Sequence, residues 1–267
     1  MTPWEGFVLG LVQGLTEFLP VSSDGHLAMS RAILGLRGPD LPFDVFVHGA
    51  TLLAILVYFR RRIMELIRGR SFVYIGKLAI ATVPAVIAAL ALRRAIDLAF
   101  GTPAVVVPAL AVTGSALLSL YLIPEKRWHA AESTDERTAG TKEPTWLDAW
   151  WIGCAQALAI LPGVSRSGST IVTGIWLGLA PASAAEFSFL MGIPAITGAL
   201  VLEAPRMSAA AASGQAATYL TGAAIAFASG LAAIALVFRL LPRREFRWFG
   251  FYCWAAAIAF ALFLWLR

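Results

Sequence analysis

Six apolar runs, each long enough to cross a lipid bilayer as a helix, dominate this sequence. A transmembrane helix needs about 20 mostly apolar residues to cross a hydrocarbon core roughly 30 Å thick. The runs are Leu41–Phe59, Phe72–Leu92, Pro103–Ile123, Ser183–Leu202, Ala217–Phe238 and Trp248–Leu266. We therefore predict an all-α integral membrane protein with six transmembrane helices.

The composition agrees with this class. Hydrophobic residues make up 59% of the chain and charged residues 14%, whereas a soluble domain has roughly 45–50% and 25%. This excludes an ordinary soluble enzyme. The net charge of +5 does not indicate nucleic-acid binding, because the arginines lie beside apolar runs, as the positive-inside rule requires. Cys154 and Cys253 lie in apolar stretches without metal-ligand spacing, so neither a disulfide framework nor a zinc site is predicted.

Two further pairs of apolar segments are too short to span, and each pair is broken by a loop with proline and serine. They are Pro3–Leu19 with His26–Leu36, joined by residues 20–25, and Trp146–Leu161 with Ser169–Leu179, joined by residues 162–168. We predict that they form two re-entrant helical hairpins. Non-helical backbone at membrane depth is tolerated only where protein or a wet cavity satisfies its polar groups, so both loops are expected to line a cavity.

The two halves of the chain resemble each other at a constant offset of 143 residues. The matching pairs are Gly10/Gly153, Gln13/Gln156, Leu15/Leu158, Val21/Val164, Ser22/Ser165, Gly25/Gly168, Phe46/Phe189 and Gly49/Gly192. Each half contains one hairpin and three spans, and the positive-inside rule sends Leu41–Phe59 inward but Ser183–Leu202 outward. We predict two inverted-topology repeats, 1–123 and 146–267, joined within one membrane domain by a cytoplasmic linker at 124–145. A substrate site is expected at the repeat interface.

Polar residues that suit chemistry gather in the first hairpin. Gln13 and Glu17 are four residues apart and share one helix face, and their oxygens suit a hard cation such as Mg²⁺ or Ca²⁺. Ser23, Asp24 and His26 follow within nine residues of Glu17, adding a hydroxyl, a second carboxylate and a titratable base. Ionisable residues at membrane depth indicate function. The structural alternative is that these groups satisfy a bent backbone.

Other ionisable residues in the apolar segments have structural interpretations. We expect Glu5, Asp44 and Asp148 to reach the interface from helix ends. His48, one turn from Asp44, is interpreted as an interior hydrogen-bonded histidine.

The second loop, Ser165-Arg166-Ser167-Gly168-Ser169-Thr170, stands directly before a predicted helix. A helix N-terminus offers free N–H donors and the positive end of a dipole, and arginine offers a bidentate fork for oxyanions. The loop therefore predicts a phosphate or carboxylate site. Both loops together indicate an amphiphilic substrate with a phosphate-rich head.

Both motifs resemble those of the undecaprenyl-pyrophosphate phosphatase family of the bacitracin-resistance type. Residues 13–26 match its stretch (Glu/Gln)-x-x-x-Glu running into Pro-Val-Ser-Ser-x-Gly-His, and residues 162–170 match Pro-Gly-x-Ser-Arg-Ser-x-x-Thr. Similarity at 43–59 and 186–198 extends the resemblance over most of the chain. The 124–145 segment does not share it.

The resemblance implies a multi-pass enzyme of the bacterial plasma membrane. Its substrate would be the C55 isoprenyl pyrophosphate, from which it removes the terminal phosphate to regenerate the carrier lipid for envelope polymers such as peptidoglycan. Bacitracin would act by sequestering this substrate. A homodimer is compatible with the resemblance.

The family's functional residues carry over position by position. The resemblance implies catalytic roles for Glu17, Ser23, His26 and Arg166, metal binding by Gln13 and Glu17, and pyrophosphate binding by Arg166 and Ser165. We also predict Asp24 as a metal ligand. Further predicted substrate-binding residues in the two loops are Ser22, Ser167, Gly168, Ser169 and Thr170. Gln13 stands where many members have a second glutamate, and Asp24 where a neutral residue is common. Our hypothesis is that Asp24 compensates for the missing charge.

Three routes to the phosphorus atom stay open. His26 attacks directly, Ser23 attacks with His26 as base, or His26 activates a water molecule. In the predicted topology the two loops enter from opposite faces, so Arg166 must reach across the midplane to meet Glu17.

The sequence allows one rival function and excludes another. A lipid-phosphate transporter or flippase is the stronger, because inverted repeats with opposed re-entrant loops are common in transporters, and it predicts translocation without phosphate release. Another class of membrane lipid phosphatase requires a histidine six residues after the motif arginine. Val172 occupies that position, which excludes this class.

Overall fold

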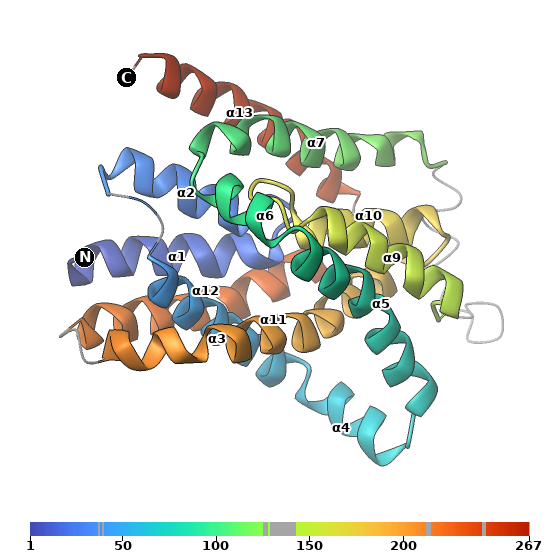
Figure 1. Ribbon diagram of the computed structural model, residues 1–267. Helices are drawn as coiled ribbons and strands as arrows, with labels where there is room; N and C mark the ends of the chain where they lie inside the picture. Colours follow the sequence, from blue (N-terminus) through green and yellow to red (C-terminus); the bar gives the residue numbers. More distant parts are fainter. Residues whose placement is uncertain are drawn as a thin grey trace.

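The computed structural model describes residues 1–36, 38, 40–124, 128, 143–211, 215–241 and 244–266, and of residues 203–211 the backbone alone. Within these ranges the regular structure is all helical, and no strand occurs (Figure 1). The helices are α1 (Pro3–Phe18), α2 (Ser23–Ile33), α3 (Leu41–Tyr58), α4 (Arg60–Arg68), α5 (Phe72–Ala91), α6 (Arg93–Phe100), η1 (Pro103–Val105), α7 (Val106–Ser119), η2 (Leu120–Leu122), α9 (Trp146–Leu158), α10 (Arg166–Trp176), α11 (Pro181–Ala211), α12 (Ala216–Leu240), η3 (Glu245–Arg247) and α13 (Trp248–Leu266).

The prediction of six spans is confirmed. In the part of the chain that the structure describes, six helices are long and apolar enough to cross a membrane: Leu41–Tyr58, Phe72–Ala91, Pro103–Leu122, Pro181–Leu202, Ala216–Leu240 and Glu245–Leu266. Each lies within a few residues of the run expected from the sequence. The predicted linker at 124–145 falls mostly outside the described residues.

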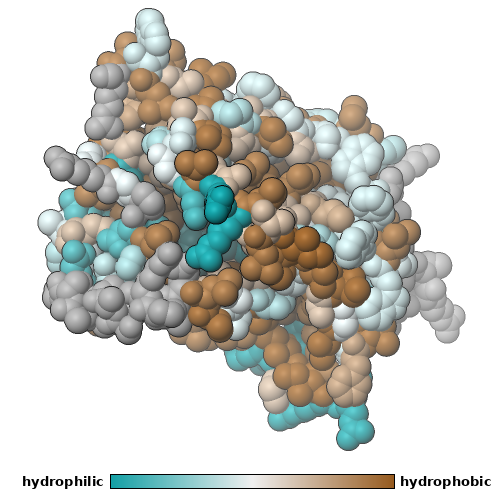
Figure 2. Space-filling model, viewed as in Figure 1, coloured by the Kyte–Doolittle hydropathy of each residue, from teal (hydrophilic) through white to brown (hydrophobic). Residues whose placement is uncertain are grey.

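Two short helices lie in connections for which the sequence predicted no structure. The arginine-rich α4 follows α3, and α6 follows α5. Figure 2 shows a largely hydrophobic face with hydrophilic residues gathered at the centre of the view and at the lower edge, over α4. In Figure 1, α4 lies at the bottom of the view, α9 begins at the right, and both chain termini lie at the left.

The helix pairs α1–α2 and α9–α10 occupy the two segments predicted as hairpins, but their second helices begin earlier than expected. The sequence placed these starts at His26 and Ser169, whereas α2 begins at Ser23 and α10 at Arg166. The cause is N-capping, in which a serine side chain accepts a free N–H group of the first turn. Ser22 Oγ accepts from the Gly25 N–H at 3.3 Å, and Ser165 Oγ accepts from the Gly168 N–H at 3.0 Å.

Glycines bring the short helices close to the spans. Helix α1 packs against α12, α9 against α5, and α7 against α13. A Cβ atom added at Gly10 would collide with the backbone of Gly222, and one added at Gly153 would collide with the backbone of Ala81. Small residues allow such backbone contact between helices in a membrane, where apolar burial alone does not drive association.

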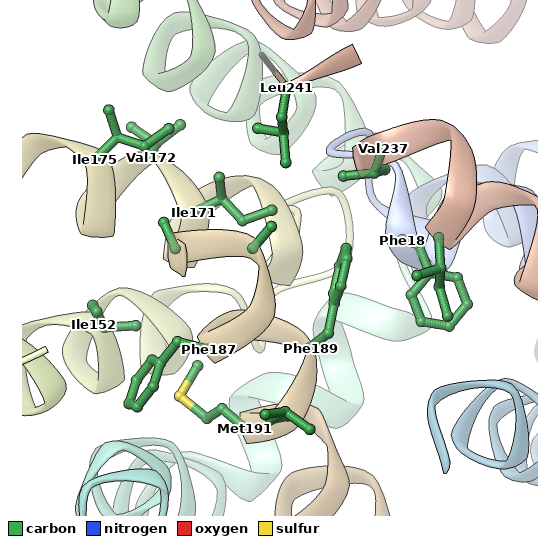
Figure 3. Close-up of a cluster of buried hydrophobic side chains, with 14 of the residues drawn as sticks. Phe18, Ile152, Ile171, Val172, Ile175, Phe187, Phe189, Met191, Val237 and Leu241 are labelled. Carbon is green, nitrogen blue, oxygen red and sulfur yellow. The ribbon is translucent and has the colours of Figure 1, made fainter. Parts of the chain in front are cut away.

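A hydrophobic core joins the two halves around the ends of α1 and α10. Figure 3 shows Phe18, Phe189, Val237 and Leu241 converging from α1, α11 and the end of α12, with Ile171 of α10 beside them. The Phe18 ring meets the Phe189 ring edge-on, with centroids 5.5 Å apart. Because Phe18 is fully buried, the helix end that carries the neighbouring Glu17 is held in place by packing.

Candidate active site

The two turns predicted to line a cavity meet at the centre of the molecule. The Gly163 N–H donates to Ser22 Oγ at 3.1 Å, and Ser167 Oγ donates to the Leu19 carbonyl oxygen at 3.1 Å. A Cβ atom at Gly25 would lie only 3.0 Å from the Cα atom of Gly163. Segments about 140 residues apart in sequence therefore share one polar centre.

Two spans fix these turns through their side chains. Thr113 of α7 donates to the Gly163 carbonyl oxygen at 3.0 Å and accepts from the Ser165 N–H at 3.0 Å. Cys253 of α13 directs its Sγ atom at the Pro20 carbonyl oxygen, 3.7 Å away. Polar groups of non-helical backbone inside a membrane protein need such partners.

The Glu17 carboxylate accepts hydrogen bonds from three side chains of the polar centre. Arg166 Nη2 donates to its Oε1 atom at 2.6 Å, across 149 residues of sequence. Ser23 Oγ donates to Oε2 at 2.6 Å, and Gln13 Nε2 donates to the same oxygen at 3.1 Å. The Glu17 residue is 6% exposed, so the carboxylate depends on these donors for its stability. The expected meeting of Glu17 with Arg166 does occur.

His48 lies beside both carboxylates of the first motif. Its Nδ1 atom is 2.8 Å from the Asp44 carbonyl oxygen, which can only accept, so Nδ1 carries a proton. Its Nε2 atom is 3.7 Å from Glu17 Oε2 and 3.7 Å from Asp24 Oδ1. The interpretation of His48 as a hydrogen-bonded interior histidine describes the contact of Nδ1 with Asp44. It does not include the contacts of Nε2 with the carboxylates of Glu17 and Asp24.

The two ring nitrogens of His26 contact groups other than Glu17. Its Nδ1 atom is 2.8 Å from the Ser22 carbonyl oxygen and its Nε2 atom is 2.8 Å from the Tyr252 hydroxyl. The ring also stacks on Tyr252, with centroids 5.6 Å apart and planes 10° apart. Because the carbonyl oxygen must accept from Nδ1, Nε2 of a neutral His26 accepts a hydrogen bond that the Tyr252 hydroxyl donates. Both ring nitrogens are thus occupied.

The residues predicted to bind substrate divide into two groups. The structure contains a cavity of about 1080 Å³. Ser22, Ser165 and Arg166 line this cavity, whereas Ser167, Gly168, Ser169 and Thr170 are not among its lining residues. The Thr170 hydroxyl lies 2.7 Å from the Arg166 carbonyl oxygen and 2.6 Å from Ser188 Oγ, inside the α10–α11 contact. Substrate binding by the second group stays a prediction.

The cavity of about 1080 Å³ combines a polar end with an apolar wall. The polar end holds Thr16, Glu17, Ser22, Ser23, Asp24, Asp44, His48, Gln156, Ser165 and Arg166. The apolar wall comes from α3, α5, α6 and α11, and it includes Leu41, Val45, Ala85, Val86, Ala89, Leu90, Phe100, Ile193, Ile196, Val201 and Leu202. Such a cavity suits an amphiphile with a polar head.

The polar end also offers oxygen ligands for a hard cation. Glu17 and Asp24 line this end, whereas Gln13 beside Glu17 is fully buried and is not among the lining residues. The Gln13 Oε1 atom has no hydrogen-bond partner within the described residues. Those residues contain no group of three or more His, Cys, Asp or Glu side chains arranged to hold a metal ion. An amide oxygen with one or two carboxylates fits Mg²⁺, which usually completes its coordination with waters and substrate phosphates.

Comparison with known proteins identifies the family of this chain. The model of the bacitracin resistance protein family, BacA, matches residues 6–259. The chain belongs to this family. A relative from Gemmatimonas aurantiaca, named undecaprenyl-diphosphatase, is 39% identical over 267 residues, covering 94% of each chain. Another with the same name, from Methanococcus maripaludis, is 35% identical over 266 residues, covering 97% of this chain and all of its own.

Membership of the BacA family confirms the resemblance drawn from residues 13–26 and 162–170. A third undecaprenyl-diphosphatase, from Desulfosudis oleivorans, is 39% identical over 273 residues, covering 95% of each chain. Together with the six apolar helices, the family makes this chain a multi-pass membrane protein.

The sequence did not predict four residues of the polar end, Thr16, Asp44, His48 and Gln156, or the Tyr252 partner of His26. Asp44, which was expected to reach the interface from a helix end, pairs with Arg31 and lines the cavity. His48 had a signal, since it stands on an apolar face one turn from Asp44. Gln156 had a signal in its match with Gln13. Tyr252 had none, because nothing in the sequence connects it with His26, 226 residues away.

Proposed function

We propose that this chain is an undecaprenyl-diphosphatase, which hydrolyses the C55 isoprenyl pyrophosphate to the monophosphate carrier lipid and phosphate. One observation carries the proposal: Arg166, Ser23 and Glu17 line one end of a cavity whose wall on α3, α5, α6 and α11 is mostly apolar. Cationic and hydroxyl groups suit the pyrophosphate, and the wall suits the first isoprene units. The names of the three relatives support the same activity.

In the proposed mechanism Ser23 is the nucleophile and Glu17 its base. Ser23 Oγ already donates to Glu17 Oε2 at 2.6 Å, so its proton passes to this carboxylate as Oγ attacks the terminal phosphorus. The bond from that phosphorus to the bridging oxygen breaks, and its electron pair leaves with the lipid monophosphate. Water then hydrolyses the phosphoserine, releasing phosphate, and the proton returns from Glu17 to Ser23 Oγ.

Arg166 would stabilise the charge of the transferred group. Its side chain directs Nη2 at Glu17 and Nη1 toward the Ser188 carbonyl oxygen at 3.5 Å. A guanidinium has five N–H donors, so several stay available for phosphoryl oxygens. Donors fixed before the reaction lower the barrier because they need no reorganisation as charge develops.

The contacts of His26 favour a positioning role over the three routes considered from sequence. Its bond to the Ser22 carbonyl oxygen and its contact with Tyr252 tie the first turn to α13. His26 would thus hold Ser23 in place without touching the phosphorus.

A divalent cation, Mg²⁺ or Ca²⁺, is part of the proposal. Glu17, Asp24 and the unpartnered Oε1 atom of Gln13 would hold it at the polar end. When bound, it neutralises charge on the phosphoryl oxygens as a Lewis acid.

The proposed architecture keeps the two inverted-topology repeats, 1–123 and 146–267, each beginning with a re-entrant hairpin. Local structure supports this, because Thr2 with Glu5 and Thr145 with Asp148 form the same capping box. At about 1.5 Å per residue, the 16 residues of α1 and the 13 of α9 are also too short to cross the hydrocarbon core.

The finer biological context is also proposed. The enzyme would lie in the bacterial plasma membrane and recycle the carrier lipid, so that its product counteracts bacitracin, which sequesters the substrate. A homodimer stays a prediction. The transporter hypothesis gains no support from the three relatives, which carry the name of a phosphatase.

Phosphate release from undecaprenyl diphosphate by the purified protein in detergent tests the proposal. The wild type should release phosphate, and rapid acid quenching should trap phosphate on Ser23. Ser23→Ala should lose both signals while retaining the melting temperature. Translocation of the lipid without phosphate release would contradict the proposal.

A further inference from the structure

Gln156 of α9 is a buried polar residue that the proposed mechanism does not use. It is 3% exposed and lines the large cavity. Neither its Nε2 nor its Oε1 atom has a hydrogen-bond partner within the described part of the chain. Buried amides in native proteins nearly always find partners, so an exception calls for an explanation.

Gln13, the residue that matches Gln156 in the first half of the chain, has an anionic hydrogen-bond acceptor that Gln156 lacks. Gln13 Nε2 donates to the carboxylate of Glu17, one helical turn further on. Residue 160, one turn after Gln156, is an isoleucine. The amide of Gln156 therefore lacks the anionic acceptor that satisfies Gln13, and its donor stays available to an anion that enters the cavity.

The position of Gln156 indicates which part of a substrate it meets. One turn before it, Gly153 packs directly against Ala81 of α5. Further along α5, Ala85 and Val86 belong to the apolar wall of the cavity. Glu17 and Ser23, the proposed reacting groups, come instead from α1 and α2. Gln156 thus belongs to the polar end on the side of α5, which also supplies part of the apolar wall, rather than on the side of α1 and α2.

We propose that Gln156 is a further substrate-binding residue, whose Nε2 donates a hydrogen bond to the phosphate that stays attached to the lipid. This inference rests on the proposed phosphatase function. It gives the cavity separate contacts for the two phosphates: Arg166 and Ser23 hold the terminal phosphate, and Gln156 holds the lipid-linked one.

Gln156→Leu tests the inference, because leucine removes the amide and keeps most of the volume. KM for undecaprenyl diphosphate should rise about tenfold, as expected when a hydrogen bond to a charged group is lost, while kcat changes little. Inhibition by the product, undecaprenyl phosphate, should weaken in parallel, and inhibition by inorganic phosphate should not change. The melting temperature without ligand should stay equal or rise, since an unpaired buried amide has been removed.

Two further variants sharpen the test. Gln156→Glu keeps the size but adds a negative charge, and it should raise KM more than Gln156→Leu. Gln215→Leu is a matched control, because the Gln215 Oε1 atom also lacks a partner among the described residues but the residue does not line the cavity. An unchanged KM in Gln156→Leu, an equal rise in Gln215→Leu, or an effect confined to inorganic phosphate would overturn the inference.

Binding separates this inference from the activity. An undecaprenyl methylenebisphosphonate, with carbon in place of the bridging oxygen, cannot be hydrolysed and should raise the melting temperature of the wild type more than that of Gln156→Leu. If this difference appears although the wild type releases no phosphate, the proposed function fails and the role of Gln156 stands. Equal stabilisation of both proteins would refute the role of Gln156 whatever the activity.

Discussion

The buried ion pair between Glu17 and Arg166 can be tested through protein stability, independently of catalytic activity. The two side chains are 5% and 16% exposed, and their atoms lie 2.6 Å apart. Arg166→Met leaves the Glu17 carboxylate buried with only neutral donors and a histidine 3.7 Å away. Removing one partner of such a pair costs about 3–5 kcal/mol, whereas replacing both is often neutral.

Thermal unfolding in detergent, without metal, measures this effect. One kcal/mol corresponds to roughly 2–4 °C for a chain of 150–250 residues, so Arg166→Met should lower the melting temperature by roughly 6–20 °C. Adding Glu17→Gln to this variant should recover most of the loss. Arg62→Met is the control, because Arg62 and its partner Glu186 are 34% and 30% exposed and such pairs contribute only about 0–1 kcal/mol.

The refuting outcome is additivity. If the two single substitutions sum to the double variant within about 0.5 kcal/mol, Glu17 and Arg166 are not coupled, and the geometry of the polar centre is wrong. A loss in Arg62→Met as large as that in Arg166→Met would equally refute the argument, since burial would then not decide the cost.

Three further predictions follow from the same contacts. Removing divalent cations with EDTA should abolish phosphate release, and Asp24→Asn should raise the Mg²⁺ concentration needed to restore it; an unchanged requirement would exclude Asp24 as a ligand. Tyr252→Phe should cost about 1 kcal/mol of stability and lower kcat only a few-fold, whereas a complete loss of rate would favour a direct chemical role for His26. Gly10→Leu should prevent the close packing of α1 on α12 and yield a protein that unfolds during purification, while Leu11→Ala, on the exposed side of α1, should be tolerated.

The sequence predicts the spans well because a membrane imposes their length and composition. Leu41–Tyr58 and Phe72–Ala91 end within one residue of the apolar runs. Helix starts at the turns were less accurate. Hydropathy gives no indication that Ser22 and Ser165 cap the helices that follow them. Capping places Ser23 in the first turn of α2 and Arg166 in the first turn of α10.

The polar centre was predicted in part. Motifs indicated Glu17, Ser23 and Arg166, because charged and hydroxyl groups are rare in apolar segments. The roles of His26 and His48 could not be separated from sequence, because they depend on contacts with Tyr252 and Asp24 that the helix packing decides. An unpartnered amide such as Gln156 is visible only when every neighbour is known.

The central claim is that the two turns form one active site. Rates of phosphate release from undecaprenyl diphosphate by the wild type, Glu17→Gln, Arg166→Met and the double variant test it most directly. Each single substitution should lower kcat at least about a hundredfold, the usual cost of losing a donor or base at such a site, and the double variant should be little slower than either. Losses that multiply in the double variant, or a wild-type rate in Arg166→Met, would contradict the claim.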